Sequence, residues 1–412
     1  MTENADFFGE FPPHSQHKLL ILEKYFEAWG FKLALRPGAG DELLYVDACA
    51  GPGRDDTGNP GSPLIAARAA AVAQAHISKR RGAPFRIRVV AIEKNKKHFA
   101  ALSDLLAPFG SGVTAKHGSL DQFIDEIETE FKALPWLYFI DPFGLEPLRA
   151  TLVRRALDGP MHEVFLLFAG QAALRHFGAV DEGETRAERK RDRFNDRVGS
   201  QIALFDEMNQ QVQSKRESLA QRARESRVSR NLTRDSAVRI LNAAYDDEGA
   251  WLQQIDETHR ERRREVFLER YLGRLASWGA EYRLPIPILN SDGTQVYTLI
   301  HATHSAVGHR TMKEAVHYAL RHSPLPSTVT EHMRQKMRAN LQLVAASIRH
   351  RFAGKNARWA EDKLDRSTPS VRNYALEQTP MHLCDADELK RLLKPFRVSG
   401  ATIVYRFPDT SS

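Results

Sequence analysis

Cysteine is almost absent from this 412-residue chain, which contains only Cys49 and Cys384. Two cysteines cannot build a disulfide framework or a cysteine zinc site, so a reducing, cytoplasmic location is expected. No stretch approaches the roughly 20 apolar residues of a membrane span. The first residues, MTENADFFGEF, are polar and acidic and lack the basic-then-apolar pattern of a signal peptide. The expectation is therefore an intracellular protein without a membrane partner.

Basic residues are in excess, and their distribution is uneven. The formal net charge is +7. From Glu331 onward there are 15 Lys and Arg residues against nine Asp and Glu residues, so nearly all of the excess lies in the last fifth of the chain. Charge of this kind permits a polyanionic partner, although it does not specify a fold.

Apolar strand patterns alternate with helical patterns over the first 180 residues. Strands are expected at 42–48, 86–94, 136–144 and 162–170, with a weaker one at 113–119. Helical spacing separates them, and a first helix carrying Leu19, Leu22 and Phe26 precedes them, with Ser15 as its expected cap. This alternation predicts an α/β fold in which helices cover both faces of a parallel sheet.

The remainder divides by composition. Residues 1–180 are expected to form the core, and 181–275 to form a charged helical insertion without strands. Residues 276–322 are expected to return to the core as a hairpin and a helix, because Asp292-Gly293 separates two strand patterns. Residues 323–412 are expected to form a basic helical domain that ends in a helix and a hairpin, the order of a winged helix.

The turn after the first expected strand, in YVDACAGPG (residues 45–53), suits close approach of a ligand to the backbone. A phosphate-binding loop would carry Gly-Lys-Ser/Thr, and the loop from 48 to 61 contains no lysine. A dinucleotide fingerprint would place its third glycine two positions away from Gly58. Glu93 ends the second strand and suits the two hydroxyls of a ribose. Without a phosphate cradle, the expected ligand is an unphosphorylated nucleoside, S-adenosylmethionine (SAM).

Five short motifs in a fixed order resemble the three-Cys-motif partner (TcmP) family. They are HSQHK, YVDACAGPG, GSPL, AIEK and FIDPFG, and VYTLIHATHSAVGH resembles a later block. The likeness spans roughly residues 10–175 and 280–320, and a more distant one connects the chain to ribosomal-RNA adenine-N6 methyltransferases. The resemblance implies a Rossmann-like class I methyltransferase sheet and SAM as cofactor. The family's name refers to cysteines in a partner protein, which implies a cysteine-motif partner.

The resemblance also assigns roles to residues of this chain. The turn would pass under the methionine moiety, Glu93 and the adjoining Lys94 would lie at the ribose, and two further groups would complete the cofactor site. These groups are Asp47, Ala48, Gly51, Pro52 and Gly53 in the turn, His14, Ser15 and Lys18 over the methionine end, and Ser119, Leu120 and Asp121 at the adenine.

Asp141, Pro142 and Phe143 stand where amino-group methyltransferases carry Asp/Asn-Pro-Pro-Tyr/Phe, and are the expected catalytic residues. There the acidic side chain and a carbonyl accept hydrogen bonds from the target amine while a ring stacks on a flipped base. Phe143 replaces the second proline, and Gly144 stands at the aromatic position. This departure leaves the target nitrogen open.

Three functions stay open at this point. The first is a SAM-dependent methyltransferase that acts on an amino group of RNA or DNA. The second is a methyltransferase-like binding protein that acts as the partner of another, radical-SAM-like enzyme. The third is a nucleotide-modifying transferase that uses another part of SAM.

The region from His332 to Ala360 has seven basic residues and no acidic one, which is typical of a phosphate-backbone contact. Those residues are Arg334, Lys336, Arg338, Arg349, Arg351, Lys355 and Arg358. A partner-protein groove or an anionic surface would fit such a region as well. His301, His304 and His309 have no carboxylate near them in sequence, so packed or solvated histidines are favoured over a metal site.

Overall fold

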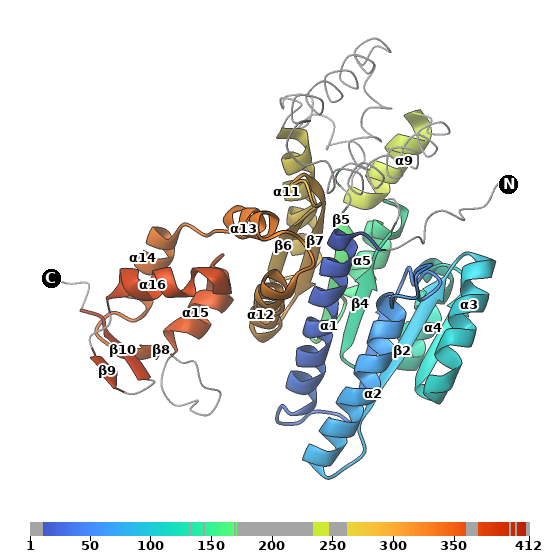
Figure 1. Cartoon of the computed structure of the whole chain (residues 1–412), viewed down its shortest axis with the longest axis horizontal. Coiled ribbons are helices and arrows are strands. Elements are labelled where there is room, and N and C mark those ends of the chain that lie inside the picture. Colours follow the sequence, from blue (N-terminus) through green and yellow to red (C-terminus); the bar gives the residue numbers. More distant parts are fainter. Residues whose placement is uncertain are drawn as a thin grey trace.

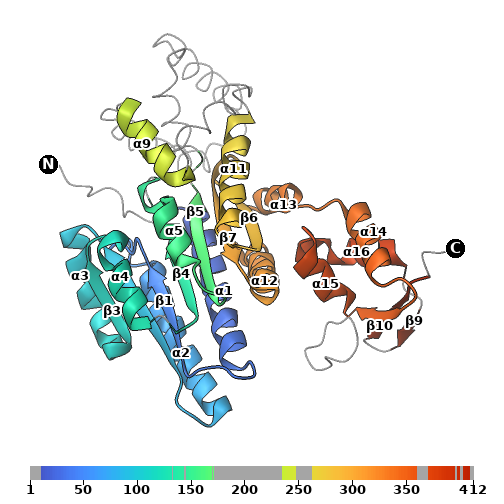
Figure 2. The same cartoon turned by 180° about the vertical axis from the view of Figure 1, so that it is seen from behind.

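The computed structural model describes residues 11–131, 133–142, 145–168, 170, 234–246, 262–359, 370–394, 397–399 and 402–408. Its main feature is a seven-stranded sheet in the order β3-β2-β1-β4-β5-β7-β6 (Figures 1 and 2). The strands are β1 (Glu42–Asp47), β2 (Arg86–Glu93), β3 (Val113–His117), β4 (Trp136–Ile140), β5 (His162–Phe168), β6 (Tyr282–Leu289) and β7 (Gln295–Thr303).

β1 to β5 are parallel to one another, whereas β7 is antiparallel to both β5 and β6. This strand order, with β7 reversed, is that of a Rossmann-like class I methyltransferase sheet. The fold class expected from the sequence is therefore confirmed.

Helices cover both faces of the sheet. One face is covered by α1 (Pro13–Ala34), α2 (Ser62–Arg81), α12 (Ala306–His322) and α13 (Ser327–Lys336). The other is covered by α4 (Leu120–Phe131), α5 (Ala150–Ala156), α9 (Arg234–Tyr245) and α11 (Arg263–Ser277). In Figure 1 α1 and α2 lie in front of the sheet, and in Figure 2 α4 and α5 do. The helix α3 (Lys96–Leu106) and the 3₁₀ helices Ala107–Gly112 and Glu146–Leu148 complete the described helices of this larger unit, and a third 3₁₀ helix, Leu383–Asp385, lies in the last part of the chain.

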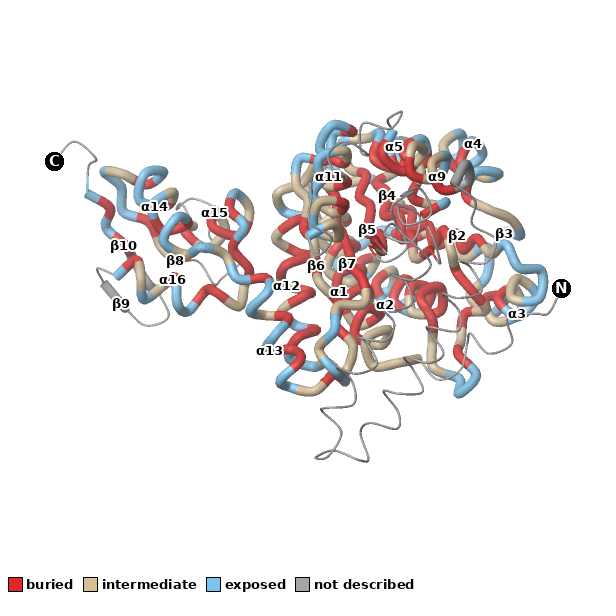
Figure 3. The backbone as a smooth tube through the Cα atoms, turned by 90° about the horizontal axis from the view of Figure 1, so that it is seen from above, coloured by how far each residue is buried: buried red, intermediate tan, exposed pale blue. Residues whose placement is uncertain are grey.

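A hydrophobic core lies on each face of the sheet, and successive side chains of a strand point alternately into one core and the other. In β4, Trp136, Tyr138 and Ile140 belong to the core on the α4/α5 side, while Leu137 and Phe139 belong to the core on the α1/α2 side. Successive residues of a strand point to opposite faces, so a wholly apolar strand fills both cores. Figure 3 shows these buried segments at the centre of the larger unit.

The described part of the expected insertion contains α9 and α11, which pack against the sheet. Leu241 of α9 and Tyr271 of α11 are fully buried in the same core as β4 and β5. Thus α11 lies in the connection that returns the chain from β5 to β6. The rest of the expected insertion lies outside the described residues.

The last part of the chain forms a small module with its own core, which projects to one side of the larger unit (Figure 3). Its elements are α14 (Leu341–Arg351), β8 (Asn356–Trp359), α15 (Val371–Gln378), α16 (Ala386–Leu393), β9 (Arg397–Ser399) and β10 (Thr402–Arg406). The antiparallel sheet has the order β8-β10-β9, and the sequence of elements is that of a winged helix. The sequence places the domain boundary at residue 323, before α13. In the structure Val329 and Met333 of α13 pack in the core of the larger unit, so this helix belongs with that unit.

Candidate functional site

Three carboxylates meet at one edge of the main sheet. Asp47 ends β1, Glu93 ends β2 and Asp141 directly follows β4. Asp47 pairs in register with Ala91 of β2 and Phe139 of β4, so the three strands end at nearly the same level. This is the edge at which open α/β sheets bind ligands.

The turn after β1 depends on glycine. Gly51 and Gly53 have φ values of 65° and 82°, in the left-handed region that favours glycine. A Cβ atom on Gly53 would lie 2.6 Å from the Leu105 side chain, and the Gly53 carbonyl accepts a hydrogen bond of 2.8 Å from Gly61 N. Ala48 is buried and Pro52 is half-buried. The turn therefore presents backbone rather than side chains.

The Glu93 carboxylate is hydrogen-bonded to the backbone of this turn. Its Oε2 accepts a hydrogen bond of 2.8 Å from Gly51 N, and its Oε1 accepts one of 2.6 Å from Asn95 N. Each carboxylate oxygen has a further lone pair, so both can still accept hydrogen bonds from a ligand. Lys94, the next residue, is exposed.

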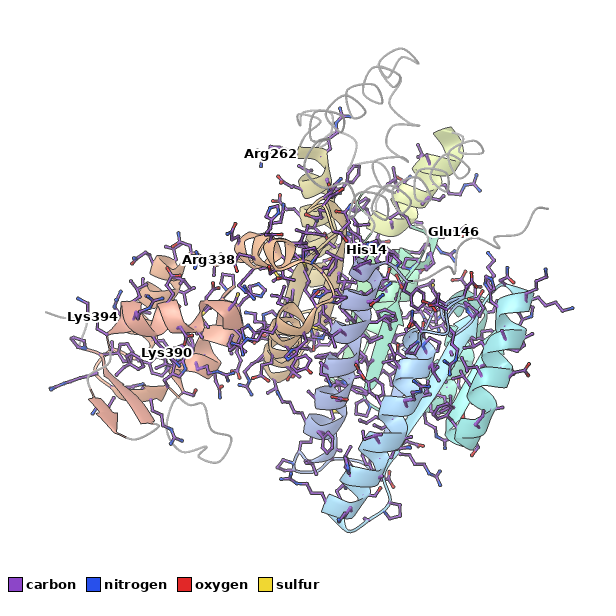
Figure 4. All side chains as sticks on the ribbon, in the orientation of Figure 1. His14, Glu146, Arg262, Arg338, Lys390 and Lys394 are labelled. Carbon is purple, nitrogen blue, oxygen red and sulfur yellow. The ribbon has the colours of Figure 1, made fainter. Side chains whose placement is uncertain are left out.

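The first turns of α1 cross the same edge. The helix begins at Pro13 with Pro12 as its N-cap, so Ser15 lies inside the helix and the expectation that it caps the helix is wrong. Lys18 donates from its ammonium to Oδ2 of Asp141. The His14 ring lies edge-on to Tyr297, whose hydroxyl donates to the His14 carbonyl at 3.4 Å. His14, at the start of α1, and Glu146, after β4, are labelled at this end of the sheet in Figure 4.

Burial controls the protonation of several groups here. Asp47 is fully buried, which raises its pKa to about 7 against the lowering effects of hydrogen bonds from Ser62 and Cys49 N. The nearby Asp141 carboxylate raises the pKa of Asp47 further, and the Lys18 ammonium lowers it. Burial and the Lys18 charge lower the pKa of His14 to about 4, so this imidazole is neutral at neutral pH.

The residues expected at the adenine lie at the end of β3. Glu93 pairs with His117, and Gly118 N donates to the Glu93 carbonyl at 3.0 Å. Ser119 N donates to Oε1 of Gln122 at 2.8 Å, whereas Leu120 is buried in the core. Asp121 forms an ion pair with Arg149. Ser119 and Asp121 therefore lie at the site edge, and Leu120 serves packing.

The expected catalytic residues are described in part. Asp141 is half-buried and Pro142 is buried. Phe143 lies outside the described residues, as does Gly144, so the expected stacking ring stays a prediction.

Sequence reasoning missed Tyr297, Arg149 and Asp55. Tyr297 comes from the antiparallel strand β7, more than 250 positions away from His14, and only the strand order brings the two together. Asp55 follows the glycine turn and accepts a hydrogen bond of 2.8 Å from Phe11 N, just before α1. It had a readable signal, since an aspartate in a Gly/Asn-rich loop commonly accepts hydrogen bonds from nearby backbone N–H groups.

The histidines singled out in the sequence lie away from this edge. Within the ranges that the structure describes, no cluster of three or more metal-ligating side chains occurs. His301 Nε2 lies 3.0 Å from Oε2 of Glu163, and Tyr25 donates to the same carboxylate. Glu163 lies near the start of β5, at the opposite end of the sheet from Asp141. Among the described helices, none has the length and apolar character to cross a bilayer.

The basic residues from Arg334 to Arg358 do not share one helix. Arg334 of α13 pairs with Glu331, and Arg338 pairs with Glu388 and lies near Asp385. Arg338 is labelled between the two units in Figure 4. Lys336 is exposed at the end of α13.

The other four belong to the winged-helix module. Arg349 donates to the carbonyl of Leu392 at 3.1 Å, and Arg351 lies over the Phe352 ring at 6.0 Å. Lys355 is exposed in the turn before β8, and Arg358 is half-buried on that strand. The basic region expected from the sequence to contact phosphate is thus divided between α13 with the turn after it and the winged-helix module.

No protein-family model and no curated protein sequence matches this chain. Among solved structures, the chain is similar to an O-methyltransferase from Bacillus cereus in complex with SAH. The two share 12% sequence identity, the match covers 69% of this chain and 80% of that one, and the TM-score is 0.32. At this score the likeness carries no argument, so the fold assignment rests on the strand order. The resemblance to the TcmP family stays a prediction.

Proposed function

We propose that this protein is a SAM-dependent methyltransferase that acts on an amino group of a nucleic acid. The observation that carries the proposal is the meeting of Asp47, Glu93 and the Lys18–Asp141 pair at one sheet edge. The cofactor would lie between the glycine turn and the start of α1.

The donor set at this edge fits SAM better than a nucleotide phosphate. The turn contains no lysine, and Arg54 donates to the Gly58 carbonyl at 2.7 Å within its own loop. Glu93 keeps acceptor capacity for two ribose hydroxyls. Ionised Asp47 would suit the ammonium group of the methionine moiety. When bound, SAM would supply a methyl group activated by a positively charged sulfur.

Asp141 gives the site its expected chemistry. A carboxylate that accepts an N–H of the target amine orients the nitrogen lone pair, and the contribution is mainly one of positioning. Lys18 occupies Oδ2 of Asp141 in the described structure. Asp141 would therefore use its other oxygen, Oδ1, for the target while Oδ2 stays paired with Lys18.

The nucleic-acid part of the proposal is supported by the C-terminal module. Arg349, Arg351, Lys355 and Arg358 are the candidate contacts with phosphate. A helix–turn–helix with strands is a common nucleic-acid-binding arrangement. Contacts with phosphate of this kind can be made to duplex and to single-stranded nucleic acid.

The decisive experiment measures transfer of tritiated methyl from SAM to total RNA, to DNA and to a cell extract. Measured at saturating SAM, so that loss of the Lys18 pair does not enter through cofactor affinity, Asp141→Ala should reduce transfer by about 10²-fold or more. Asp104→Ala, at an exposed position of α3, is the control and should behave as wild type. Absence of SAM binding at millimolar concentration would contradict the cofactor assignment.

A second candidate function is that of a binding protein that works with another enzyme. It is favoured by the ion pair between Lys18 and Asp141, because this pair uses one carboxylate oxygen that a target amine would need. In that case the purified protein would bind SAM and label none of the three substrates. Addition of the cysteine-motif partner would then be required for any turnover.

A further inference from the structure

Asp55, in the loop after the glycine turn, is a buried carboxylate that accepts five hydrogen bonds. It is only 5% exposed. Four of the bonds are local and close the loop: Thr57 N at 3.1 Å, Thr57 Oγ1 at 2.9 Å, Asn59 N at 2.7 Å and Asn59 Nδ2 at 2.8 Å. The fifth comes from Phe11 N, 44 positions earlier in the chain, at 2.8 Å to Oδ2.

The hydrogen bond from Phe11 controls how the chain enters α1. Pro12 and Pro13 follow and have no N–H, so Phe11 supplies the last backbone donor before the helix. Their rings fix φ near −65°, which makes the segment stiff. The Gln16 side chain donates to the Phe11 carbonyl at 2.8 Å and closes the segment onto the helix.

The start of α1 is consequently held at three points. Asp55 binds Phe11 N, Tyr297 contacts His14, and Asp141 pairs with Lys18. The second point belongs to β7 and the third directly follows β4, whereas the first belongs to the loop that continues the glycine turn. Of these three points, Asp55 is the one that connects the chain at the start of α1 to this loop by a hydrogen bond.

We infer that Asp55 is a positioning residue, which through the Phe11 N–H holds the first turns of α1 over the glycine turn and so sets the affinity for SAM. The inference rests on the proposed function. It assigns Asp55 no contact with the cofactor, and its effect should fall on binding rather than on the transfer step.

The state of the carboxyl agrees with this role. Burial raises the pKa of Asp55, but the hydrogen bonds from Phe11, Asn59 and Thr57 outweigh it and hold the pKa below its ordinary value. Asp55 is thus ionised at neutral pH, and the bond from Phe11 N is charge-assisted.

A pair of variants at position 11 isolates the hydrogen bond. Phe11→Pro removes both the ring and the N–H, whereas Phe11→Ala removes the ring and keeps the N–H. Calorimetry should give Phe11→Pro about tenfold weaker SAM affinity than Phe11→Ala, because a hydrogen bond to a charged group contributes about that much. At saturating SAM the two variants should have the same kcat within about twofold. Equal SAM affinities would overturn the inference.

Hydrogen exchange tests the same connection without SAM. Asp55→Ala should speed amide exchange at Gln16 to Leu19 by at least about tenfold, since the first turns of the helix lose one of three attachments. Asp55→Asn, which keeps one acceptor oxygen, should restore part of the protection. Asp56→Ala changes the exposed neighbour and should have no effect. Unchanged exchange in Asp55→Ala would overturn the inference.

The SAM-binding and hydrogen-exchange experiments together distinguish failure of the proposed function from failure of the positioning role of Asp55. If wild type fails to bind SAM, the proposed function fails, and exchange at α1 still decides whether Asp55 holds the helix. If wild type binds SAM and neither Phe11→Pro nor Asp55→Ala weakens binding, the positioning role fails and the proposed function stands.

Discussion

Lys18 and Asp141 form an ion pair across 123 positions of sequence, joining the first helix to the end of the fourth strand. The pair is largely shielded, with side-chain exposures of 10% and 23%. The Lys18 ammonium also lowers the pKa of Asp47, while Asp141 raises it. One cation therefore balances two carboxylates at the candidate site.

Replacement of Lys18 by methionine should shift the titration of Asp47. The pKa of Asp47 is about 7 with the ammonium present, and it should rise without it because burial then acts unopposed by that charge. Infrared difference spectra should show the protonated carboxyl band persisting to higher pH, with Asp47→Asn identifying the band. Lys24→Met, which removes a cation paired with Glu27 on the same helix, is the control. An unmoved midpoint in Lys18→Met would contradict the assignment.

Gly53 and Gly58 allow the glycine requirement of the turn to be tested with a matched pair. Both have positive φ, 82° and 89°, but an added Cβ meets Leu105 at 2.6 Å only at Gly53. Gly58→Ala should cost about 1 kcal/mol of unfolding free energy from backbone strain alone. Gly53→Ala should cost more than Gly58→Ala and weaken SAM binding, because its Cβ would also lie 2.6 Å from Leu105 and 3.1 Å from Leu102, so these side chains or the turn must shift. Denaturant unfolding and calorimetry measure both effects, and equal costs would show that the close approach does not matter.

The sheet and its binding edge were predictable because local patterns determine them. Apolar runs that end in Asp47, Glu93 and Asp141, separated by amphipathic helices, give a parallel sheet whose acidic residues share an edge. The position of a strand can be predicted from the apolar pattern of the residues that form it and from the turn residues that flank it. The start of α1 did not follow in this way, since Ser15 resembled a cap while Pro12 takes that place.

Contacts between distant segments were beyond local patterns. The partners of Lys18, His14 and Asp55 depend on how α1 crosses the sheet edge, which no periodicity encodes. Similarly, charge alone could not separate Arg334 and Arg338, which have carboxylate partners, from Arg349 and Arg351. Val344 and Ile348, four positions apart on α14, are both buried in the module's core, so this helix turns one face inward.

Replacing the basic residues of the winged-helix module should change the salt dependence of nucleic-acid binding more than replacing Arg334 and Arg338. Replacement of Arg349, Arg351, Lys355 and Arg358 by glutamine should reduce the slope of log affinity against log salt by roughly 0.9 for each lost duplex contact. Arg334→Gln with Arg338→Gln removes charges that already face Glu331 and Glu388, and should change the slope little. Filter binding from low to moderate salt measures both. Equal slopes for the two variant proteins would remove the module's basic set from nucleic-acid binding.

Lys313 of α12 connects the larger unit to the winged-helix module and should make stability depend on pH. Its Nζ is buried and donates to the carbonyls of Thr379 at 2.8 Å and Met381 at 2.5 Å. Burial lowers its pKa from 10.5 to about 7, against the raising effect of Asp385. Burial also lowers the pKa values of the neighbouring His309 and His382, to about 2 and about 3, so both are neutral at neutral pH.

Between about pH 7 and about 10.5 the unfolded chain holds a proton on Lys313 that the folded protein releases, so the free energy of unfolding should increase with pH across that window. Lys313→Met cannot make this exchange and leaves two carbonyls without a donor, at a cost of about 1–3 kcal/mol each. The stability gap between wild type and Lys313→Met should therefore be larger at pH 9 than at pH 6.5, by a few kcal/mol at most. Lys32→Met, which removes a half-exposed cation paired with Glu314, is the control. Urea unfolding at both pH values measures the gaps, and a constant gap for Lys313→Met would show that this ammonium keeps its ordinary pKa in the folded protein.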